Sequence, residues 1–196
     1  MDNITEKMKL HQQWLKSEGF DGHKIELDKS KLADLVKDYN DFSYVFFTSC
    51  DFEGTNINKK DFYGSELYSS VFAKSTITDS SFVKAVLDYA DFTEASIEEV
   101  NFSRADMNET LFNGAVIKNV SMVNTGLWLT NFGGATLENV DFSQAYLEEV
   151  IFSNAKLTNL LNLEKANIVS INIGTKTEPR IINGKEALQW LKDKQS

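Results

Sequence analysis

The segment YADFTEASIEEVNFSRADMNE, residues 89–109, places a large apolar residue at every fifth position. The same spacing extends in both directions, because every fifth residue from Phe42 to Leu157 is Phe, Ile, Leu or Met, in 24 consecutive positions. A spacing of five matches neither the 3.6-residue period of a helix nor the two-residue period of a strand. The sequence therefore predicts a structural repeat of the kind that builds a solenoid.

A column of mostly small residues lies two positions before the large one, as at Ala85, Ala90 and Ala95. Residues two apart on an extended chain point to the same face, so we expect both columns inside the solenoid, with Phe92 fully buried. Lys60 is a long, charged residue in this column of mostly small ones, and we expect its side chain to point outward or to mark a bulge. Asp or Asn often precedes the large residue, and its side chain suits a recurring turn.

These features resemble the pentapeptide repeat family, whose motif is A(D/N)LXX with Leu or Phe at the centre. The resemblance covers about residues 41–160. It implies an all-β solenoid, a right-handed quadrilateral β-helix with four pentapeptides per coil. The 24 repeats then make about six coils, or roughly 29 Å of tube at about 4.8 Å per layer. Phe fills alternate large positions from Phe52 to Phe152 except at Met122, which predicts Phe stacks on two opposite faces.

The ends of the chain differ in kind from the repeats. We divide the chain into an N-terminal helical cap (1–24), a pentapeptide-repeat β-helix (25–173) and a C-terminal segment with a helix (174–196). A solenoid needs its open ends covered, because a bare last coil is an unpaired strand edge.

Each end predicts a short amphipathic helix. Residues 3–18 predict the first, begun by a capping pair of Asn3 and Glu6, and we expect it to cap the tube. The second, near the C-terminus, carries Trp190 and Leu191 in an apolar stripe. For this second helix, capping and dimerisation are both open.

Nothing in the sequence predicts a catalytic site, so we expect a non-enzyme without cofactor or metal. His11 and His23 lie outside the repeats, and no Ser/His/Asp pattern is visible. The lone Cys50 fills a small-column position and predicts a buried thiol. No stretch resembles a signal peptide or is long and apolar enough to span a bilayer, so a cytoplasmic protein without membrane contact is expected.

The negative charge of the chain is concentrated in the repeats. Residues 41–160 hold 17 Asp and Glu against 7 Lys and Arg, a net charge of −10. This argues against direct binding of nucleic acid, which requires a basic surface. It fits a rod that imitates DNA, although B-DNA has one charge per about 1.7 Å and the tube has a little over half that density.

Members of the pentapeptide repeat family that inhibit or protect gyrase are similar to DNA in shape and charge and engage the DNA-binding saddle of type II topoisomerases. The resemblance therefore implies a non-catalytic protein-binding module that acts as an acidic DNA mimic on a type II topoisomerase such as gyrase. This chain departs from the resistance group because no loop interrupts its repeats. The carboxylates expected to carry the contact are Glu94, Glu98, Glu99, Glu109, Glu138, Glu148 and Glu149.

The alternative function is a scaffold or regulatory module whose partner meets an aromatic face. Folding the sequence at twenty residues per coil gathers exposed aromatic residues outside Leu67, Leu87 and Leu127. Contiguous exposed aromatics usually mark a contact surface, unless a terminal helix covers them. We predict a homodimer through this face or through the C-terminal helix. The interface candidates are Tyr68, Tyr89, Trp128, Leu129, Tyr146, Trp190 and Leu191.

Overall fold

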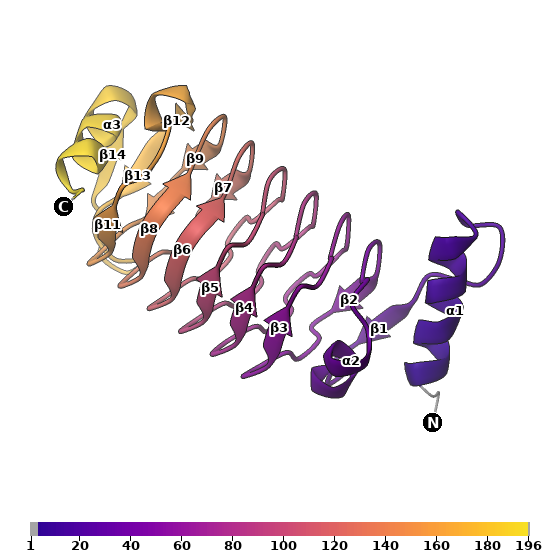
Figure 1. The fold of residues 1–196 in the computed structure, drawn as a ribbon. Helices are drawn as coiled ribbons and strands as arrows, with labels where there is room; N and C mark the ends of the chain where they lie inside the picture. Colours follow the sequence, from indigo (N-terminus) through magenta and orange to yellow (C-terminus); the bar gives the residue numbers. More distant parts are fainter. Residues whose placement is uncertain (1–3, 196) are drawn as a thin grey trace.

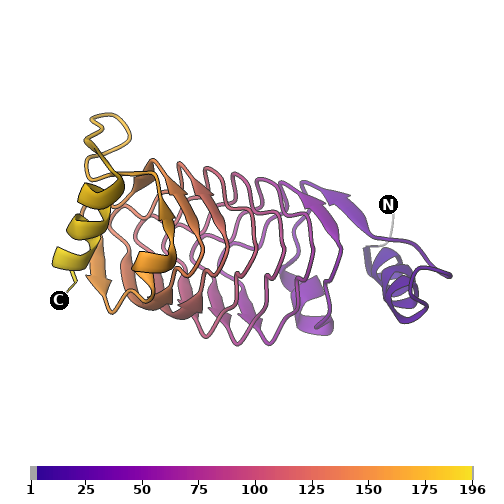
Figure 2. The same cartoon turned by 90° about the horizontal axis from the view of Figure 1, so that it is seen from above.

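The computed structural model describes residues 4–195 and shows a β-solenoid of about seven turns with few helices. The coils are stacked along one axis, and a helix lies at each end of the tube (Figure 1). Seen from above, the chain zigzags from coil to coil without a break in the stack (Figure 2). The predicted solenoid class is confirmed.

Each coil takes twenty residues, so the chain pairs with itself in parallel at that spacing. Ile57, Ile77 and Ile97, for example, lie in register on neighbouring strands. The sheet that contains them has six strands: β3 (Asn56–Asn58), β4 (Thr76–Thr78), β5 (Ser96–Glu98), β6 (Val116–Ser121), β8 (Thr136–Asp141) and β11 (Lys156–Thr158).

Two other sides of the tube carry shorter sheets. One side holds β1 (Glu26–Asp28) paired with β2 (Phe46–Thr48), and further along β7 (Gly126–Trp128), β9 (Tyr146–Glu148) and β12 (Asn167–Ile168). Another holds β10 (Val150–Ile151), β13 (Ser170–Asn172) and β14 (Ile181–Asn183). Isolated parallel bridges at the same spacing, such as Asp51 with Val71, join the coils between the named strands.

We number the four faces of the tube by their inward large residues. Face 1 runs from Phe42 to Phe142, face 2 from Phe47 to Leu147, face 3 from Phe52 to Phe152 and face 4 from Ile57 to Leu157, each in steps of twenty residues. The parallel strand pairs of the tube extend from the β1–β2 pair at the N-terminal end to the β10–β13 pair at the C-terminal end.

The core is built from two ladders of stacked Phe rings on faces 1 and 3. On face 3, the ring centroids of Phe72 and Phe92 lie 4.7 Å apart with an interplanar angle of 5°. Across the tube, Phe82 meets Phe92 edge to face at 6.3 Å and 82°. Met122 interrupts the ladder on face 1, since Phe102 and Phe142 lie on either side of it. The predicted stacking of Phe on two opposite faces is therefore confirmed.

The corners of the coils use a backbone conformation that the sequence did not reveal. The second residue after each large one has positive φ at all 24 positions from Tyr44 to Asn159, and only four of these are Gly. A left-handed conformation costs a non-Gly residue about 1–2 kcal/mol. At one edge of face 4, this cost is partly offset because Asn119, Asn139 and Asn159 form a ladder of side-chain hydrogen bonds at 2.8 and 2.7 Å.

Asp and Asn before the large residue serve the turns, as the sequence predicts. The Asp91 Oδ1 atom accepts a hydrogen bond from the Thr93 backbone N–H at 2.8 Å, and Asn101 and Ser103 repeat the arrangement at 2.9 Å. The same bond recurs at Asp41, Asp51, Asp61, Asn131 and Asp141. These carboxylates are therefore part of the fold.

The expectation for Lys60 was wrong. Lys60 is only 8% exposed, and it marks no bulge, since β3 pairs regularly just before it. Its ammonium group donates hydrogen bonds to the Tyr39 carbonyl oxygen and the Asn40 Oδ1 atom, both at 2.7 Å. Tyr39 is the C-cap of α2 (Ala33–Asp38), where carbonyl groups lack helical partners and favour a cation. Burial lowers the pKa of Lys60, against an opposing effect of Asp38.

Both ends of the tube are covered by helices. At the N-terminal end, α1 (Ile4–Lys16) buries Met8 and His11; the predicted capping residue Asn3 lies outside the described residues. At the C-terminal end, the short 3₁₀ helix η1 (Leu163–Lys165) precedes α3 (Gly184–Asp193), which buries Ala187 and Leu191 against the last coil.

His11 fastens α1 to the first coil. Its Nε2 atom lies 3.0 Å from the Ser43 carbonyl oxygen, and its Nδ1 atom accepts a 3.4 Å hydrogen bond from the Ile25 N–H. These roles define a neutral ring protonated on Nε2. Burial lowers the pKa of His11, although the Ser43 bond and the charge of Asp41 oppose the effect.

The first prediction concerns the core. Phe92→Ala should lower the free energy of unfolding by about 3–5 kcal/mol, because the ring is fully buried between two stacked neighbours. Urea denaturation measures the change. Phe20, which is 93% exposed, provides the control, since Phe20→Ala should leave the stability unchanged. A small loss at Phe92 would contradict the core packing described above.

The second prediction concerns the corners. Glu99 has a left-handed φ of 55°, and its place in the next coil is taken by Asn119, the first member of the asparagine ladder. Glu99→Asn should raise the free energy of unfolding by about 0.5–1.5 kcal/mol, since Asn tolerates this conformation and adds a hydrogen bond. Glu98→Asn, one residue earlier in β5, should bring no gain, because Asn is depleted in strands. Equal effects at both positions would contradict the explanation.

The third prediction concerns pH. Because the pKa of His11 is lowered on folding, its stabilising contribution is present above the unfolded value of about 6.5 and is lost as pH falls below it. Thermal unfolding followed from about pH 7.5 to about pH 5.5 should show a falling midpoint. His11→Gln should flatten this dependence, whereas His23→Gln should not, since His23 is exposed. A dependence that survives His11→Gln would assign it to other groups.

Candidate interaction surface

The seven carboxylates predicted to bind a partner do not form one surface. Glu98 and Glu138 point outward from face 4, and Glu94 and Glu99 lie at its two bordering corners. Glu109, Glu148 and Glu149 belong to face 2 and its corner, on the opposite side of the tube. One flat partner surface can therefore contact only one of the two groups.

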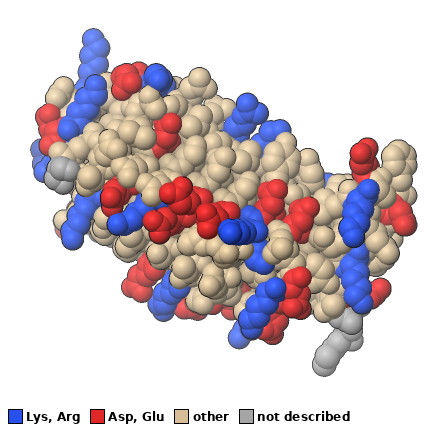
Figure 3. Space-filling view, in the orientation of Figure 1, with Lys and Arg blue, Asp and Glu red and all other residues tan. Residues whose placement is uncertain are grey.

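On face 4, the negative charge is partly compensated within the chain. Lys118 lies between Glu98 and Glu138 in the strand register, and its Nζ atom is 2.9 Å from the Glu138 Oε2 atom. The hydrogen bond that the Lys118 ammonium group donates to Glu138 raises the pKa of Lys118. On the side of the tube that Figure 3 displays, acidic side chains gather along the middle and basic ones lie beside them.

Face 2 is different because its charge is uncompensated. We define its outer surface as the residues immediately before, immediately after and two after each large residue, from Phe46 to Glu149. In this described stretch it has six carboxylates and no Lys or Arg, whereas each of the other three faces has at least one basic residue between 41 and 160. The six are Glu66, Asp88, Asp106, Glu109, Glu148 and Glu149.

The same face has the exposed aromatic side chains. Tyr89 is 55% exposed, and Phe46, Trp128 and Tyr146 are close to 40%. Tyr68 is half-buried beside Phe46, with ring centroids 6.5 Å apart. Within residues 4–195, no terminal helix covers these side chains, so the alternative that a terminal helix hides them was wrong.

The remaining interface candidates differ in accessibility. Leu129 is half-buried at a left-handed corner of face 2. Trp190 is half-buried at the C-terminal end, where the Lys194 Nζ atom lies 5.7 Å from its ring. Leu191 has no exposed surface, because α3 turns it into the tube. Leu191 therefore caps the last coil and cannot meet a partner.

Local contacts on face 2 leave its negative field in place. The Asp88 Oδ1 atom accepts hydrogen bonds from the Asn108 backbone N–H at 2.9 Å and side-chain Nδ2 at 3.0 Å. Burial and then Asp88 raise the pKa of Asp106. Burial, followed by Glu66, Asp88 and Asp106, raises the pKa of Tyr68. A cation supplied from outside the chain would relieve this repulsion.

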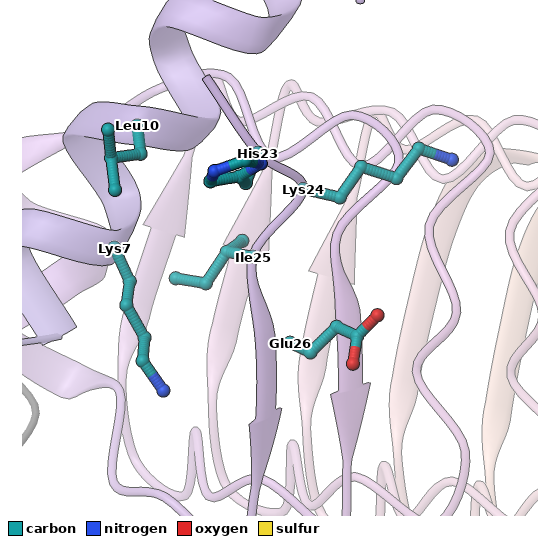
Figure 4. A pocket seen from close by; sticks show the side chains of 6 residues that line it. All are labelled: Lys7, Leu10, His23, Lys24, Ile25 and Glu26. Carbon is teal, nitrogen blue, oxygen red and sulfur yellow. The ribbon is translucent and has the colours of Figure 1, made fainter.

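A shallow hollow lies at the seam between α1 and the first coil (Figure 4). The Lys24 Nζ atom lies 4.9 Å from the Trp14 ring and 5.4 Å from the Tyr44 ring, a cation–π contact that joins helix to tube. Lys7 and Leu10 line the hollow from α1, and His23, Lys24, Ile25 and Glu26 line it from the segment that leads into β1.

Three further features bear on chemistry and location. Within the described residues, no three His, Cys, Asp or Glu side chains are close enough together to hold a metal ion. Cys50 is buried, and burial raises the pKa of its thiol. Among the described helices, none combines the length and the apolar character needed to cross a membrane.

The fold and its surface define a class, a β-solenoid of five-residue repeats that presents one acidic and aromatic face. Residues 40–119 match the family model "Pentapeptide repeat region", and residues 129–159 match "Pentapeptide repeats (8 copies)". The chain belongs to the pentapeptide repeat family. Proteins of this family are generally structural or interaction modules. No curated protein matches the sequence.

Several solved pentapeptide repeat proteins are similar to this chain. The plasmid-mediated fluoroquinolone resistance protein QnrB1 is 15% identical, with a TM-score of 0.41, over 74% of this chain and 79% of that one. HetL, involved in heterocyst differentiation regulation in the cyanobacterium Nostoc sp. strain PCC 7120, is 19% identical, with a TM-score of 0.28. The match covers 76% of this chain and 87% of HetL. A pentapeptide repeat protein from the Arabidopsis thaliana thylakoid lumen is 23% identical, with a TM-score of 0.28. The match covers 62% of this chain and 70% of that protein.

Proposed function

We propose that the chain is a non-catalytic protein-binding module that contacts its partner through face 2. The observation that carries this proposal is the interleaving of six carboxylates with exposed aromatic rings on a face without Lys or Arg. The rings offer apolar area of the kind that anchors interfaces. The carboxylates attract a basic surface, which favours fast and specific association.

The charge of face 2 favours a partner other than a second copy of the chain. A symmetric contact of face 2 with itself would place carboxylates against carboxylates, which is unfavourable. A homodimer through the C-terminal end, around Trp190, stays a prediction. We take the partner of face 2 to be a different protein with a basic and partly apolar surface, in the cytoplasm.

The specific partner that we propose is the basic DNA-binding surface of a type II topoisomerase such as gyrase. The net charge of −10 over residues 41–160 and the rod shape support this DNA-mimic version. The exposed aromatics support the alternative, a scaffold or regulatory module unrelated to topoisomerases, because imitation of a phosphate backbone requires charge but no apolar rings.

The fourth prediction tests the contact face with two matched triple variants. Glu109, Glu148 and Glu149 are changed to Gln on face 2; the matched set is Glu98 on face 4 together with Glu94 and Glu99 at the two corners that border face 4. Each set removes three charges, at two left-handed corners and one strand position. Wild-type protein at micromolar concentration should inhibit gyrase supercoiling, less so as salt rises. The face 2 variant should lose this effect and the face 4 variant should keep it.

The outcomes separate the two versions of the function. Equal loss in both variants would contradict face 2 as the contact surface. If wild-type protein leaves gyrase unaffected, the topoisomerase version fails and the scaffold version is tested with a photo-crosslinking residue at Trp128. The matched control position is Val116, exposed to a similar extent on face 4. A partner crosslinked from position 128 and equally from position 116 would contradict a face 2 contact.

A further inference from the structure

The outer surface of face 2 has one position without a side chain. Gly126 lies in register between Asp106 and Tyr146, on strands that pair in parallel. A Cβ atom placed on Gly126 would lie 3.4 Å from the Asp106 Oδ1 atom and 3.8 Å from the Asn108 Oδ1 atom. The missing side chain therefore leaves a notch bordered by two side-chain oxygen atoms.

Two exposed aromatic residues flank Gly126 in the strand register. Tyr146 occupies the next coil directly in register with Gly126, and Trp128 lies two residues along the same strand and points to the same side. The Tyr146 hydroxyl group donates a 2.7 Å hydrogen bond to the Glu148 Oε2 atom, which ties the ring to a further carboxylate. The notch thus has an oxygen side and an aromatic side.

Asp106 is available to a ligand, unlike the Asp residues that serve the turns. Asp91 and Asp141 each accept a backbone hydrogen bond from their own turn. No hydrogen bond or ion pair to a described residue engages the Asp106 carboxylate, and that side chain is exposed. Partial desolvation of the carboxyl group and the charge of Asp88 raise the pKa of Asp106.

We infer that this notch binds an arginine side chain of the protein partner, an inference that rests on the proposed function of face 2. A guanidinium group is planar, donates hydrogen bonds to carboxylate oxygen atoms in a fixed fork and stacks on aromatic faces. It would donate to Asp106 and Asn108 while lying against Trp128 or Tyr146. Apolar residues that flank the arginine would cover the exposed rings.

The test uses a peptide of alternating Leu and Arg and a control peptide in which citrulline replaces each Arg. Citrulline keeps the planar shape and removes the charge. Binding is followed by NMR through the backbone amide of Gly126 and the indole N–H of Trp128. The Arg peptide should shift both signals and bind at least about tenfold more tightly than the citrulline peptide.

Two variants block the notch in different ways, each with a control on face 4. Gly126→Leu fills it without changing charge, and φ at Gly126 is not in the left-handed region, so a side chain can be accommodated. Ser96→Leu puts the same side chain at the corresponding position of face 4. Asp106→Asn removes the carboxylate, and Glu98→Gln removes one on the opposite side. We expect Gly126→Leu and Asp106→Asn each to bind the Arg peptide at least about tenfold more weakly than the wild type. The controls Ser96→Leu and Glu98→Gln should bind it with unchanged affinity.

Specific outcomes would overturn the inference. Equal binding of both peptides, or unchanged affinity in Gly126→Leu and Asp106→Asn, excludes an arginine site at the notch. Signals that shift elsewhere on face 2 and do not respond to Gly126→Leu also overturn the inference, but they leave the proposed function standing. Absence of peptide binding overturns the arginine site alone, because the gyrase and crosslinking experiments judge face 2 without any peptide.

Discussion

The structure depends on the closure of each coil after twenty residues. Closure brings every large side chain directly over the one twenty residues earlier, so that the rings of Phe52, Phe72 and Phe92 stack at 4.6–4.7 Å. The same condition, closure after twenty residues, thus forms both the backbone hydrogen bonds between coils and the contacts of the core. It holds only if the chain turns at every fifth residue, and this is why 24 left-handed corners are kept although only four are Gly.

The inward half of this structure could be predicted from the sequence, since buried positions tolerate few residue types. The Phe ladders and the turns made by Asp91 and its equivalents follow from the five-residue pattern, and the terminal helices follow from the amphipathic stripes outside it. The left-handed corners could not be predicted, because side chains as different as those of Tyr89 and Glu94 occupy them. Lys60 was mispredicted since its partners Tyr39 and Asn40, directly after α2, lie 21 and 20 residues earlier and outside the repeat pattern.

The division of the predicted acidic residues between two faces is a matter of register. Glu98 and Glu148 both follow a large residue directly, but they are fifty residues apart, which is two and a half coils, and so they point in opposite directions. Sorting the carboxylates by their position within twenty residues would have separated them. The same sorting would have shown that face 2 lacks basic residues, whereas the free carboxylate of Asp106 becomes visible only from its hydrogen-bonding environment.

The core and the turns account for the inward and corner positions, and they leave the outward positions free to vary. Face 4 uses this freedom to gain stability, through the Lys118–Glu138 ion pair and the asparagine ladder. Face 2 does the opposite, because it places like charges on neighbouring coils and leaves aromatic rings in water. Like charges on adjacent strands destabilise a sheet, and exposed rings contribute nothing to the core. Such an arrangement costs stability in the isolated chain, and a basic, partly apolar partner that covered the face would offset this cost, which is why we propose that face 2 carries the function.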